Sequence, residues 1–391
     1  MTDDGILDRV QALQRWLTAA ALPLWRDAGF DHHLDLFHER MDFDGRPLSA
    51  VPRRLMVQCR QVYVYAEATL LGWVDGGDLA VRAFRKMVAA FHRADGQPGW
   101  VFSIGPDGRV ADRRRDLYAH AFVLLACVGV IRLTQDLAVV ALADETLAML
   151  DEDFALPGGG YLDGLPDDGM LRQNPHMHLF EGLLALFEAT GAERYLDRAS
   201  RIYGLMAKRF FIPRLDILAE YFDREWRPAS ADHGGYDAVI WEPGHHCEWV
   251  WLLDKYARLS GVPIDPIAAA LYARAYRDGI GPDGMIADEM RGDGRIAKSS
   301  RRAWPLTEAI KANAVRYGQG DPEGERRAGQ AIKVLMRDFL TEGGLWRDHL
   351  AADGEPFHAY VPASTLYHVV VAASEAARVF GVTGTPRVGF P

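Results

Sequence analysis

A short segment rich in glycine, aspartate and aromatic residues recurs six times along the chain, at intervals of about 60 residues. In most copies an Asp-Gly pair lies near the middle, where glycine tolerates a positive φ, so each copy is predicted to form two short strands around a turn. Two helix-length stretches with apolar periodicity separate consecutive copies. The copies begin near Asp35, Gly99, Gly159, Ile217, Gly284 and Gly344.

The helices between the copies form pairs whose two members differ in character. The helix that follows a hairpin is apolar nearly all round, as in LYAHAFVLLACVGVI from Leu117, whereas the next helix has a charged face, as in GERRAGQAIKVLMRD from Gly324. An apolar helix is buried, and an amphipathic helix covers it. The sequence therefore predicts an all-α fold: an (α/α)6 barrel of twelve helices, with short β-hairpins at the N-terminal end of six parallel inner helices.

The predicted helices have these bounds. Inner helices are expected at 54–71, 116–133, 174–190, 243–259, 304–317 and 361–380. Outer helices are expected at 6–22, 79–93, 137–154, 192–211, 263–277 and 322–340.

The whole chain, 1–391, is predicted to be one domain. Its residues are 49% hydrophobic and 25% charged, and no linker or low-complexity segment interrupts the repeats. The net charge of -10, with both signs interspersed, argues against a nucleic acid or an anionic membrane as partner. The cysteines, Cys59, Cys127 and Cys247, are too far apart for a disulfide framework or a zinc ribbon.

The N-terminal segment MTDDGILDRVQALQRW is acidic and then amphipathic, unlike a signal peptide. No apolar run was expected to reach the length of about 18 residues that a membrane span needs. We therefore expect a cytoplasmic protein, either a monomer or a homodimer.

Parallel inner helices bring their first turns to one mouth of the predicted barrel. Pro243 and Gly244 mark the entry of the fourth inner helix, on which His245 and Glu248 are three residues apart and share a face. Histidines begin three consecutive inner helices and recur in the sixth, which favours a functional site over isolated core histidines. The polar and aromatic residues expected at the mouth are Gln58, Arg60, Tyr118, His120, Asn174, His176, His178, Glu181, His245, His246, Glu248, Trp304, Glu308, Ser364, Tyr367 and His368.

Such a mouth suits proton transfer on a sugar. Helix N-termini present unpaired N–H groups and positive dipole ends, which favour a developing oxyanion and lower the pKa of a histidine, so that it stays a neutral base. Arg60 brings a permanent charge and a planar fork of donors, suited to an enediolate. Trp304 offers a flat apolar face of the kind on which sugar rings stack.

Three other kinds of site are compatible with some of these residues. A metal site would use His176 and His178, but residues i and i+2 point to different sides of a helix, and no HExxH motif accompanies them. We therefore expect neither a metal nor a cofactor. Glycoside hydrolysis by carboxylates from Glu181, Glu248 or Glu308 would leave the histidines unexplained. Non-catalytic sugar binding stays open.

Four motifs at these positions resemble the N-acylglucosamine 2-epimerase family, and the resemblance covers the chain nearly end to end. The motifs are NPHMHLFEG at 174–182, EPGHHCEW at 242–249, AWPLTEAIKA at 303–312 and the pair Tyr367-His368. The resemblance implies an (α/α)6 barrel that acts on sugars at C1 and C2. The forms NPHMH, EPGHxxEW and WPxTE are similar to the D-mannose isomerase branch, whereas the FGHDxE form of cellobiose epimerases is absent.

The resemblance also implies a role for each matching residue. Arg60 would stabilise the enediolate, and His245 and His368 would be the acid/base pair, with Glu248 beside His245. The remaining matches would bind sugar hydroxyls or line the pocket: Asn174, His178, Tyr118 and Trp304.

The expected activity is metal-free interconversion of D-mannose and D-fructose through an enediolate, with a monosaccharide as partner. A sugar 2-epimerase of the N-acylglucosamine or cellobiose type remains an alternative, because it needs the same residue types. A mannose 6-phosphate isomerase is a further alternative, because arginines at 113–115 and 301–302 lie beside inner-helix starts and suit a phosphate.

Overall fold

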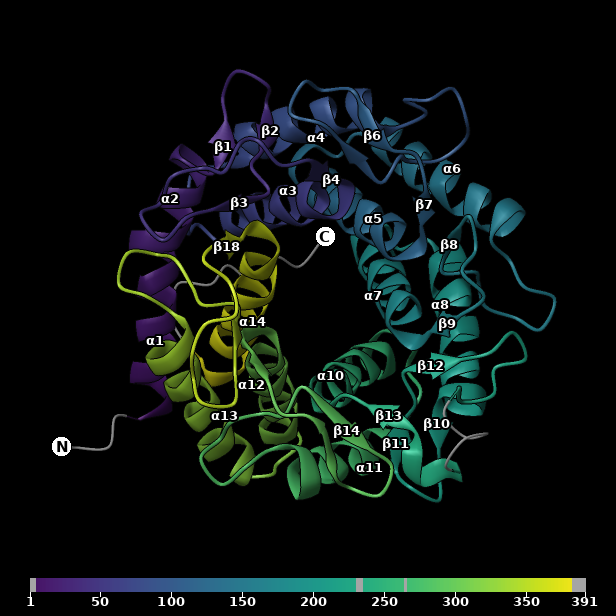
Figure 1. Cartoon of the computed structure of the whole chain (residues 1–391), viewed down its shortest axis with the longest axis vertical. Coiled ribbons are helices and arrows are strands. Elements are labelled where there is room, and N and C mark those ends of the chain that lie inside the picture. Colours follow the sequence, from purple (N-terminus) through teal and green to yellow (C-terminus); the bar gives the residue numbers. More distant parts are fainter. Residues whose placement is uncertain (1–4, 230–234, 264–265, 382–391) are drawn as a thin grey trace.

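The computed structural model of the protein describes residues 5–229, 235–263 and 266–381. Within them six inner helices form a closed ring (Figure 1), because each packs against the next and the last packs against the first. Six outer helices surround this ring, so the predicted (α/α)6 barrel is confirmed. The inner helices are α3 (Leu55–Leu70), α5 (Leu117–Thr134), α7 (Gln173–Thr190), α10 (Pro243–Ser260), α12 (Ala303–Gly318) and α14 (Leu366–Phe380). The outer helices are α1 (Ile6–Trp16), α4 (Gly77–Phe91), α6 (Leu137–Asp153), α8 (Glu193–Leu205), α11 (Pro266–Arg274) and α13 (Glu323–Val334).

Several outer helices end in a five-residue π-helical turn, which the sequence analysis merged into the helix. These turns are Leu17–Ala21, Met206–Phe210, Ala275–Gly279 and Leu335–Phe339. The first turn leads into a short additional helix, α2 (Leu22–Asp27). Residues 264–265 of the predicted helix 263–277 lie outside the described part of the chain.

The inner helix α5 bears on the expectation that no apolar run is long enough to span a membrane. It has 18 residues with a mean hydropathy of 1.8, which is long and apolar enough to cross a membrane by length and composition alone. In the structure 78% of this stretch is buried, and α5 packs between α3 and α7. A helix that is apolar on every face is what an inner position in the barrel requires.

Short strands join neighbouring repeats around the mouth, which the sequence did not predict. The strand just before each inner helix pairs with a strand from the next repeat, and the last such pair joins the C-terminal repeat to the N-terminal one. The pairs are β4 (Arg53–Arg54) with β5 (Ser103–Ile104), β7 (Arg115–Asp116) with β8 (Gly164–Leu165), β9 (Leu171–Arg172) with β12 (Tyr221–Phe222), β13 (Ile240–Trp241) with β14 (Glu289–Arg291), β16 (Arg301–Arg302) with β17 (His349–Leu350), and β18 (Val361–Pro362) with β3 (Arg40–Met41).

Among the named strands of the described residues, local hairpins form at predicted places where β5 pairs with β6 (Val110–Asp112) and where β14 pairs with β15 (Ile296–Lys298). Two others begin ahead of the predicted segments: β1 (Phe30–Asp31) with β2 (Leu36–Phe37), and β10 (Phe211–Ile212) with β11 (Ile217–Leu218). The recurrent glycine and aspartate segments therefore serve mainly to connect one repeat to the next.

A carboxylate precedes most of these connecting strands. We call the set Glu39, Asp163, Glu220, Asp288 and Asp348 the rim carboxylates. Each reaches the start of the inner helix that follows it in the chain, where it meets an arginine, a threonine or a histidine. The rim carboxylates thus fix the first turns of the inner helices, which carry the candidate site.

Candidate active site

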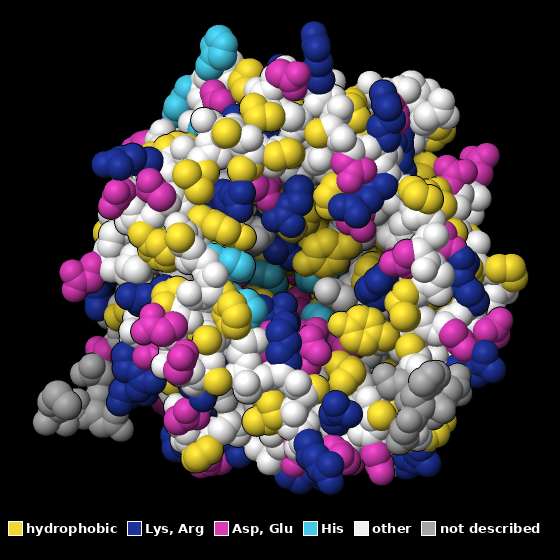
Figure 2. All heavy atoms as spheres, viewed as in Figure 1, with side chains coloured by type: hydrophobic (Ala, Val, Ile, Leu, Met, Phe, Trp, Pro, Cys, Tyr) yellow, Lys and Arg dark blue, Asp and Glu magenta, His cyan; other side chains and the backbone are white. Residues whose placement is uncertain are grey.

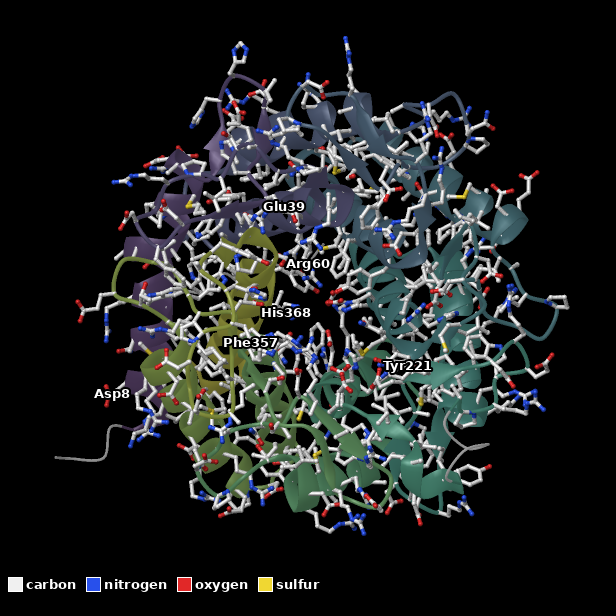
Figure 3. All side chains as sticks on the ribbon, viewed as in Figure 1. Asp8, Glu39, Arg60, Tyr221, Phe357 and His368 are labelled. Atoms are coloured by element: carbon white, nitrogen blue, oxygen red, sulfur yellow. The ribbon has the colours of Figure 1, made fainter. Side chains whose placement is uncertain are left out.

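One residue from each inner helix forms a layer across the barrel, one turn below the mouth. Each member lies six residues after the residue that caps its helix, and a shared offset places helical residues at a shared depth. All members are buried, and Figure 3 shows Arg60 and His368 near the axis. These second-turn residues are Arg60, Phe122, His178, Glu248, Glu308 and His368, counted from Arg54, Asp116, Arg172, Glu242, Arg302 and Pro362.

His368 is held by a carboxylate on the neighbouring helix. Its Nδ1 lies 3.0 Å from Oε1 of Glu308, so Nε2 is left for a ligand. Burial, followed by the charges of Arg60 and Lys311, lowers the pKa of His368 well below its usual value. The ring is therefore neutral near pH 7, with the character of a base.

His245 is held by a different carboxylate and has the opposite protonation. Its Nδ1 lies 2.9 Å from Oε1 of Glu220 and 3.8 Å from Oε2 of Glu242. Burial alone would lower the pKa of His245, but these two carboxylates outweigh burial and raise it to about 9. Near pH 7 His245 is thus a cation that can act as an acid. The sequence predicts Glu248 as the carboxylate beside His245, whereas in the structure Glu220 contacts its ring.

Trp304 stands between the two histidines. Its ring centroid lies 4.9 Å from that of His245 and 5.9 Å from that of His368. Gly244 makes this position possible, because a Cβ there would lie 2.5 Å from the Trp304 ring. The acid, the base and a flat apolar surface therefore meet at one place, as a sugar-handling site requires.

Arg60 lies beside the base on the other side of the mouth. Its Nη2 donates to the hydroxyl of Tyr118 at 2.6 Å, and its guanidinium stacks on the Phe122 ring at 4.2 Å. Its Nη1 donates to the carbonyl of Ser364 at 3.3 Å, at the start of the helix that carries His368. The structure thus brings Arg60, Tyr118 and His368 together, as the sequence analysis expected.

His178 and Glu181 form a second buried pair. Nδ1 of His178 lies 2.9 Å from Oε2 of Glu181, whose other oxygen accepts a hydrogen bond from the hydroxyl of Tyr367. Tyr118 packs edge-on against His178 with ring centroids 5.0 Å apart. Nε2 of His178 is therefore available to a sugar hydroxyl, like Nε2 of His368.

Glu248 is buried without a hydrogen-bond partner among the described residues, at either carboxyl oxygen. Burial and the neighbouring charge of Glu308 raise its pKa well above the usual value, although Lys311 opposes this. This shift favours the protonated form of Glu248, in which it can donate a hydrogen bond to a ligand.

Asn174 lines a pocket in the wall of the mouth, with a volume of about 470 Å³. Its Oδ1 is buried and has no hydrogen-bond partner in the described structure. Figure 2 shows the hollow at the centre of the mouth, with histidine side chains around it. The pocket is lined by Arg54, Met56, Phe102, Arg114, Arg115, Asp116, Tyr118, Asp163, Gly164, Pro166, Asp168, Arg172, Asn174 and Pro175.

Three histidines expected near the mouth point away from it. Nε2 of His120, His176 and His246 accepts the backbone N–H of Trp100, Tyr161 and Leu218 respectively, at 3.2, 3.0 and 3.0 Å. They occupy equivalent positions, four residues after the helix cap. Burial lowers the pKa of His120 and His176 to about 4, and that of His246 to about 3. The expectation that His120 belongs to the mouth was wrong; these histidines support the loops.

The described residues include three sets of donors that could hold a metal ion, with ligand atoms within 4.8 Å of one another. In two sets a cation already contacts a carboxylate: Lys311 lies at Glu308, and Arg302 lies at Glu242. Such a cation competes with a metal for the same oxygen atoms. The sets are His178 with Glu181 and Glu248, Glu220 with Glu242 and His245, and Glu248 with Glu308 and His368.

Comparison with known proteins agrees with the geometry. The family described as N-acylglucosamine 2-epimerase (GlcNAc 2-epimerase) matches residues 36–372. A mannose-6-phosphate isomerase of Rhizobium meliloti (strain 1021) is 36% identical over 378 residues, which are 93% of this chain and 95% of that protein. A D-mannose isomerase of Thermobifida fusca is 30% identical over 330 residues, 78% of each chain.

The fold has close structural relatives as well. The structure of cellobiose 2-epimerase from Bacillus thermoamylovorans B4167 matches with a TM-score of 0.84 at 20% identity, over 95% of this chain and 99% of the other. The resemblance seen in the motifs is confirmed: the chain belongs to the N-acylglucosamine 2-epimerase family, whose members are sugar epimerases and isomerases.

Proposed function

We propose that the protein is an aldose–ketose isomerase that interconverts D-mannose and D-fructose by metal-free proton transfer. The observation that carries this proposal is that two histidines on either side of Trp304 are held by different carboxylates. His368 is a neutral base held by Glu308, and His245 is a cationic acid held by Glu220. Environments that push two pKa values apart assign the base and the acid.

The reaction begins with opening of the sugar ring. His245 gives its proton to the ring oxygen and takes up the proton that the anomeric hydroxyl loses, so that C1 becomes a carbonyl and His245 is a cation again. Trp304 carries the sugar between the histidines, and Asn174 and His178 bind its hydroxyls. The open-chain aldose then presents C2 to the base.

In the next step Nε2 of His368 removes the proton from C2, and the electron pair moves onto the carbonyl oxygen at C1. The cis-enediolate that results is negatively charged, and the guanidinium of Arg60 and the inner-helix N-termini stabilise it. The proton on O2 moves to O1, and His368 returns its proton to C1. The product is the ketose.

The same residues allow a different outcome at the last step. If His245 protonated C2 from the opposite face, the product would be the 2-epimer, D-glucose, instead of D-fructose. Product analysis by NMR after incubation with D-mannose separates the two: fructose supports the isomerase, and glucose assigns a 2-epimerase. Binding of mannose without any product would support a sugar-binding protein.

Mannose 6-phosphate is a second candidate substrate, because arginines line the pocket beside Tyr118 and Asn174 and because the relative of Rhizobium meliloti carries that name. Arg114 is the most accessible of them: it is about half exposed, and it stacks on Phe102 at 3.7 Å. All four arginines are paired with carboxylates: Arg114 with Asp112 at 3.1 Å, Arg54 with Glu39, Arg115 with Asp95, and Arg172 with Asp163 and Asp168.

The test is a comparison of kcat/KM for mannose and for mannose 6-phosphate. If the phosphate is held in this pocket, Arg114→Gln lowers kcat/KM for the phosphosugar about tenfold and leaves mannose unchanged. Arg113→Gln is the matched control, because Arg113 is exposed and does not line the pocket. If both variants change kcat/KM equally for mannose and for mannose 6-phosphate, the pocket does not hold a phosphate, and mannose remains the proposed substrate.

A further inference from the structure

Lys311 is a fully buried lysine that the mechanism above does not use. It lies on α12, three residues after Glu308, and its side chain has no exposure to solvent. Its Nζ lies 2.5 Å from Oε2 of Glu308 and 3.8 Å from the ring centroid of Trp251 on α10. Burial of an ammonium group is costly, so its presence under the site requires a carboxylate partner.

We propose that Lys311 is a positioning residue: acting through Glu308, it holds His368 in the tautomer that carries its proton on Nδ1 and presents Nε2 to the sugar. This inference rests on the proposed function, because that function makes His368 the base. Lys311 itself does not touch the substrate.

The two carboxyl oxygens of Glu308 have different partners. Oε1 lies 3.0 Å from Nδ1 of His368, and Oε2 faces the ammonium of Lys311. An ionised carboxylate only accepts hydrogen bonds, so it fixes the proton of His368 on Nδ1. A protonated Glu308 can donate to Nδ1 instead, and the proton of His368 then moves to Nε2, where it blocks the base.

Other charged and titratable groups face Glu308 and His368 from every inner helix around them. Glu181 is bonded to His178 and Tyr367, and Glu248 is a second carboxyl group, so neither can neutralise the charge of Glu308. The cation in direct contact with Glu308 is Lys311. The surrounding groups are Arg60 on α3, Tyr118 on α5, His178 and Glu181 on α7, His245 and Glu248 on α10, and Tyr367 on α14.

The sign of the effect on pH dependence follows from this geometry. The active form has Glu308 ionised and His368 neutral. Loss of the ammonium lets Glu308 and His368 bind a proton at higher pH, because Lys311 opposes protonation of both groups. The acid limb of kcat/KM therefore moves to higher pH when Lys311 is neutralised.

The test uses Lys311→Met in the full chain, with Lys255→Met as control. Lys255 also lies on an inner helix, with its Nζ 2.9 Å from Oε2 of Glu188, but it is outside the site. We expect Lys311→Met to move the acid limb up by about one pH unit, which lowers kcat/KM about tenfold on that limb and leaves KM little changed. Activity should recover as pH rises, which a packing defect would not allow.

A double-mutant cycle with Glu308→Gln separates positioning from structure. If Lys311 acts only through the charge of Glu308, adding Lys311→Met to Glu308→Gln changes kcat less than about twofold. Fully additive losses would overturn the inference. The comparison of Glu308→Gln with the double variant remains possible even if Lys311→Met alone fails to fold, because the double variant has lost both charges of the Lys311–Glu308 pair.

A measurement without turnover distinguishes failure of the inference from failure of the proposed function. Nitrogen NMR of histidine-labelled protein reports the tautomer of His368, assigned by its loss in His368→Gln. We expect Nδ1–H in the unmodified protein and loss of that state in Lys311→Met. This change without turnover of any aldose would refute only the proposed function. Normal turnover with an unchanged tautomer and pH profile in Lys311→Met would refute only the role of Lys311.

Discussion

Oε1 of Glu220 lies 2.9 Å from Nδ1 of His245, although Glu220 precedes a connecting strand and His245 begins an inner helix 25 residues later. Rim carboxylates hold other helix starts as well. Asp348 accepts a hydrogen bond from Thr365, which lies three residues after its helix cap as His245 does. The other rim carboxylates hold the cap arginines themselves, which are Arg54, Arg172 and Arg302. In one repeat the group that a rim carboxylate holds is a histidine. The proposed acid thus occupies a structural position of the repeat.

Glu220→Gln should move the alkaline limb of the pH profile. His245 is the proposed acid, with a pKa raised to about 9, and activity should fall when it loses its proton. A neutral amide removes part of the field that raises this pKa, so the fall should begin at lower pH, by about one pH unit. Profiles of kcat/KM from pH 5 to 10 measure this. Glu225→Gln, on the same hairpin but exposed, is the control. If the alkaline limb of Glu220→Gln stays where it is in the unmodified protein, the acid is a group other than His245.

His368→Gln should abolish most of the turnover while substrate still binds. A positioned general base contributes about 10²- to 10⁴-fold, so kcat should fall within that range and KM should change little. His33→Gln, at an exposed histidine, provides the control. If His368→Gln kept full turnover, the base would have to be assigned elsewhere.

The three histidines that support the loops should make the fold sensitive to acid. His120, His176 and His246 have pKa values of about 4, 4 and 3 in the folded protein, against 6.5 when free. Because their folded pKa values are lowered by burial, their neutral forms support the fold above pH 6.5, and this support is lost as pH falls from 6.5 toward 4. The loss between pH 7.5 and 5.5 is about 1 kcal/mol for each histidine.

Glutamine is the matched replacement at these positions. Gln58 occupies the equivalent place in the first repeat and accepts the N–H of Phe37 at 2.8 Å. The triple variant His120→Gln, His176→Gln and His246→Gln should therefore lose less stability between pH 7.5 and 5.5 than the unmodified protein, in urea unfolding followed by circular dichroism. An equal loss in both proteins would show that other groups control acid unfolding.

Removal of metal ions should leave the activity intact. The proposed proton transfers use His245, His368 and Arg60, and cations already contact the carboxylates Glu242 and Glu308. Turnover of mannose after dialysis against EDTA, with the metal content measured on the same sample, tests this. A loss of activity that added zinc or manganese restores would assign a metal to one of the donor sets.

The fold was predictable from the sequence because its signal is periodic. Apolar inner helices and amphipathic outer helices alternate, and only a closed ring buries six inner helices equally. The pairing of the strands was not predictable, because two-residue strands carry no alternation of side chains, and their partners lie in the next repeat. The pairing is made by backbone hydrogen bonds, which are the same for nearly every residue type, so the residue types of a strand do not reveal its partner.

The sequence predicted which residues lie in the site better than it predicted which groups hold them in place. The residues Arg60, His178, Glu248 and His368 do lie in one layer, because motif positions at the starts of parallel helices converge. Glu220 escaped notice because its segment looked like an ordinary hairpin; alignment of the rim carboxylates between repeats would have shown it. Lys311 escaped because a lysine in a helix ordinarily faces solvent, and only the packing of α10 against α12 shows that this one does not.

The most direct test of the central claim is isotope exchange during turnover. The protein is freed of metal ions and incubated with D-mannose in deuterium oxide, and the products are followed by proton and deuterium NMR. D-fructose with deuterium at one of its two C1 positions is expected, because the proton that His368 takes from C2 exchanges with the solvent and His368 then delivers a deuteron to C1 on the same face. Absence of fructose together with absence of exchange at C1 and C2 would contradict the central claim.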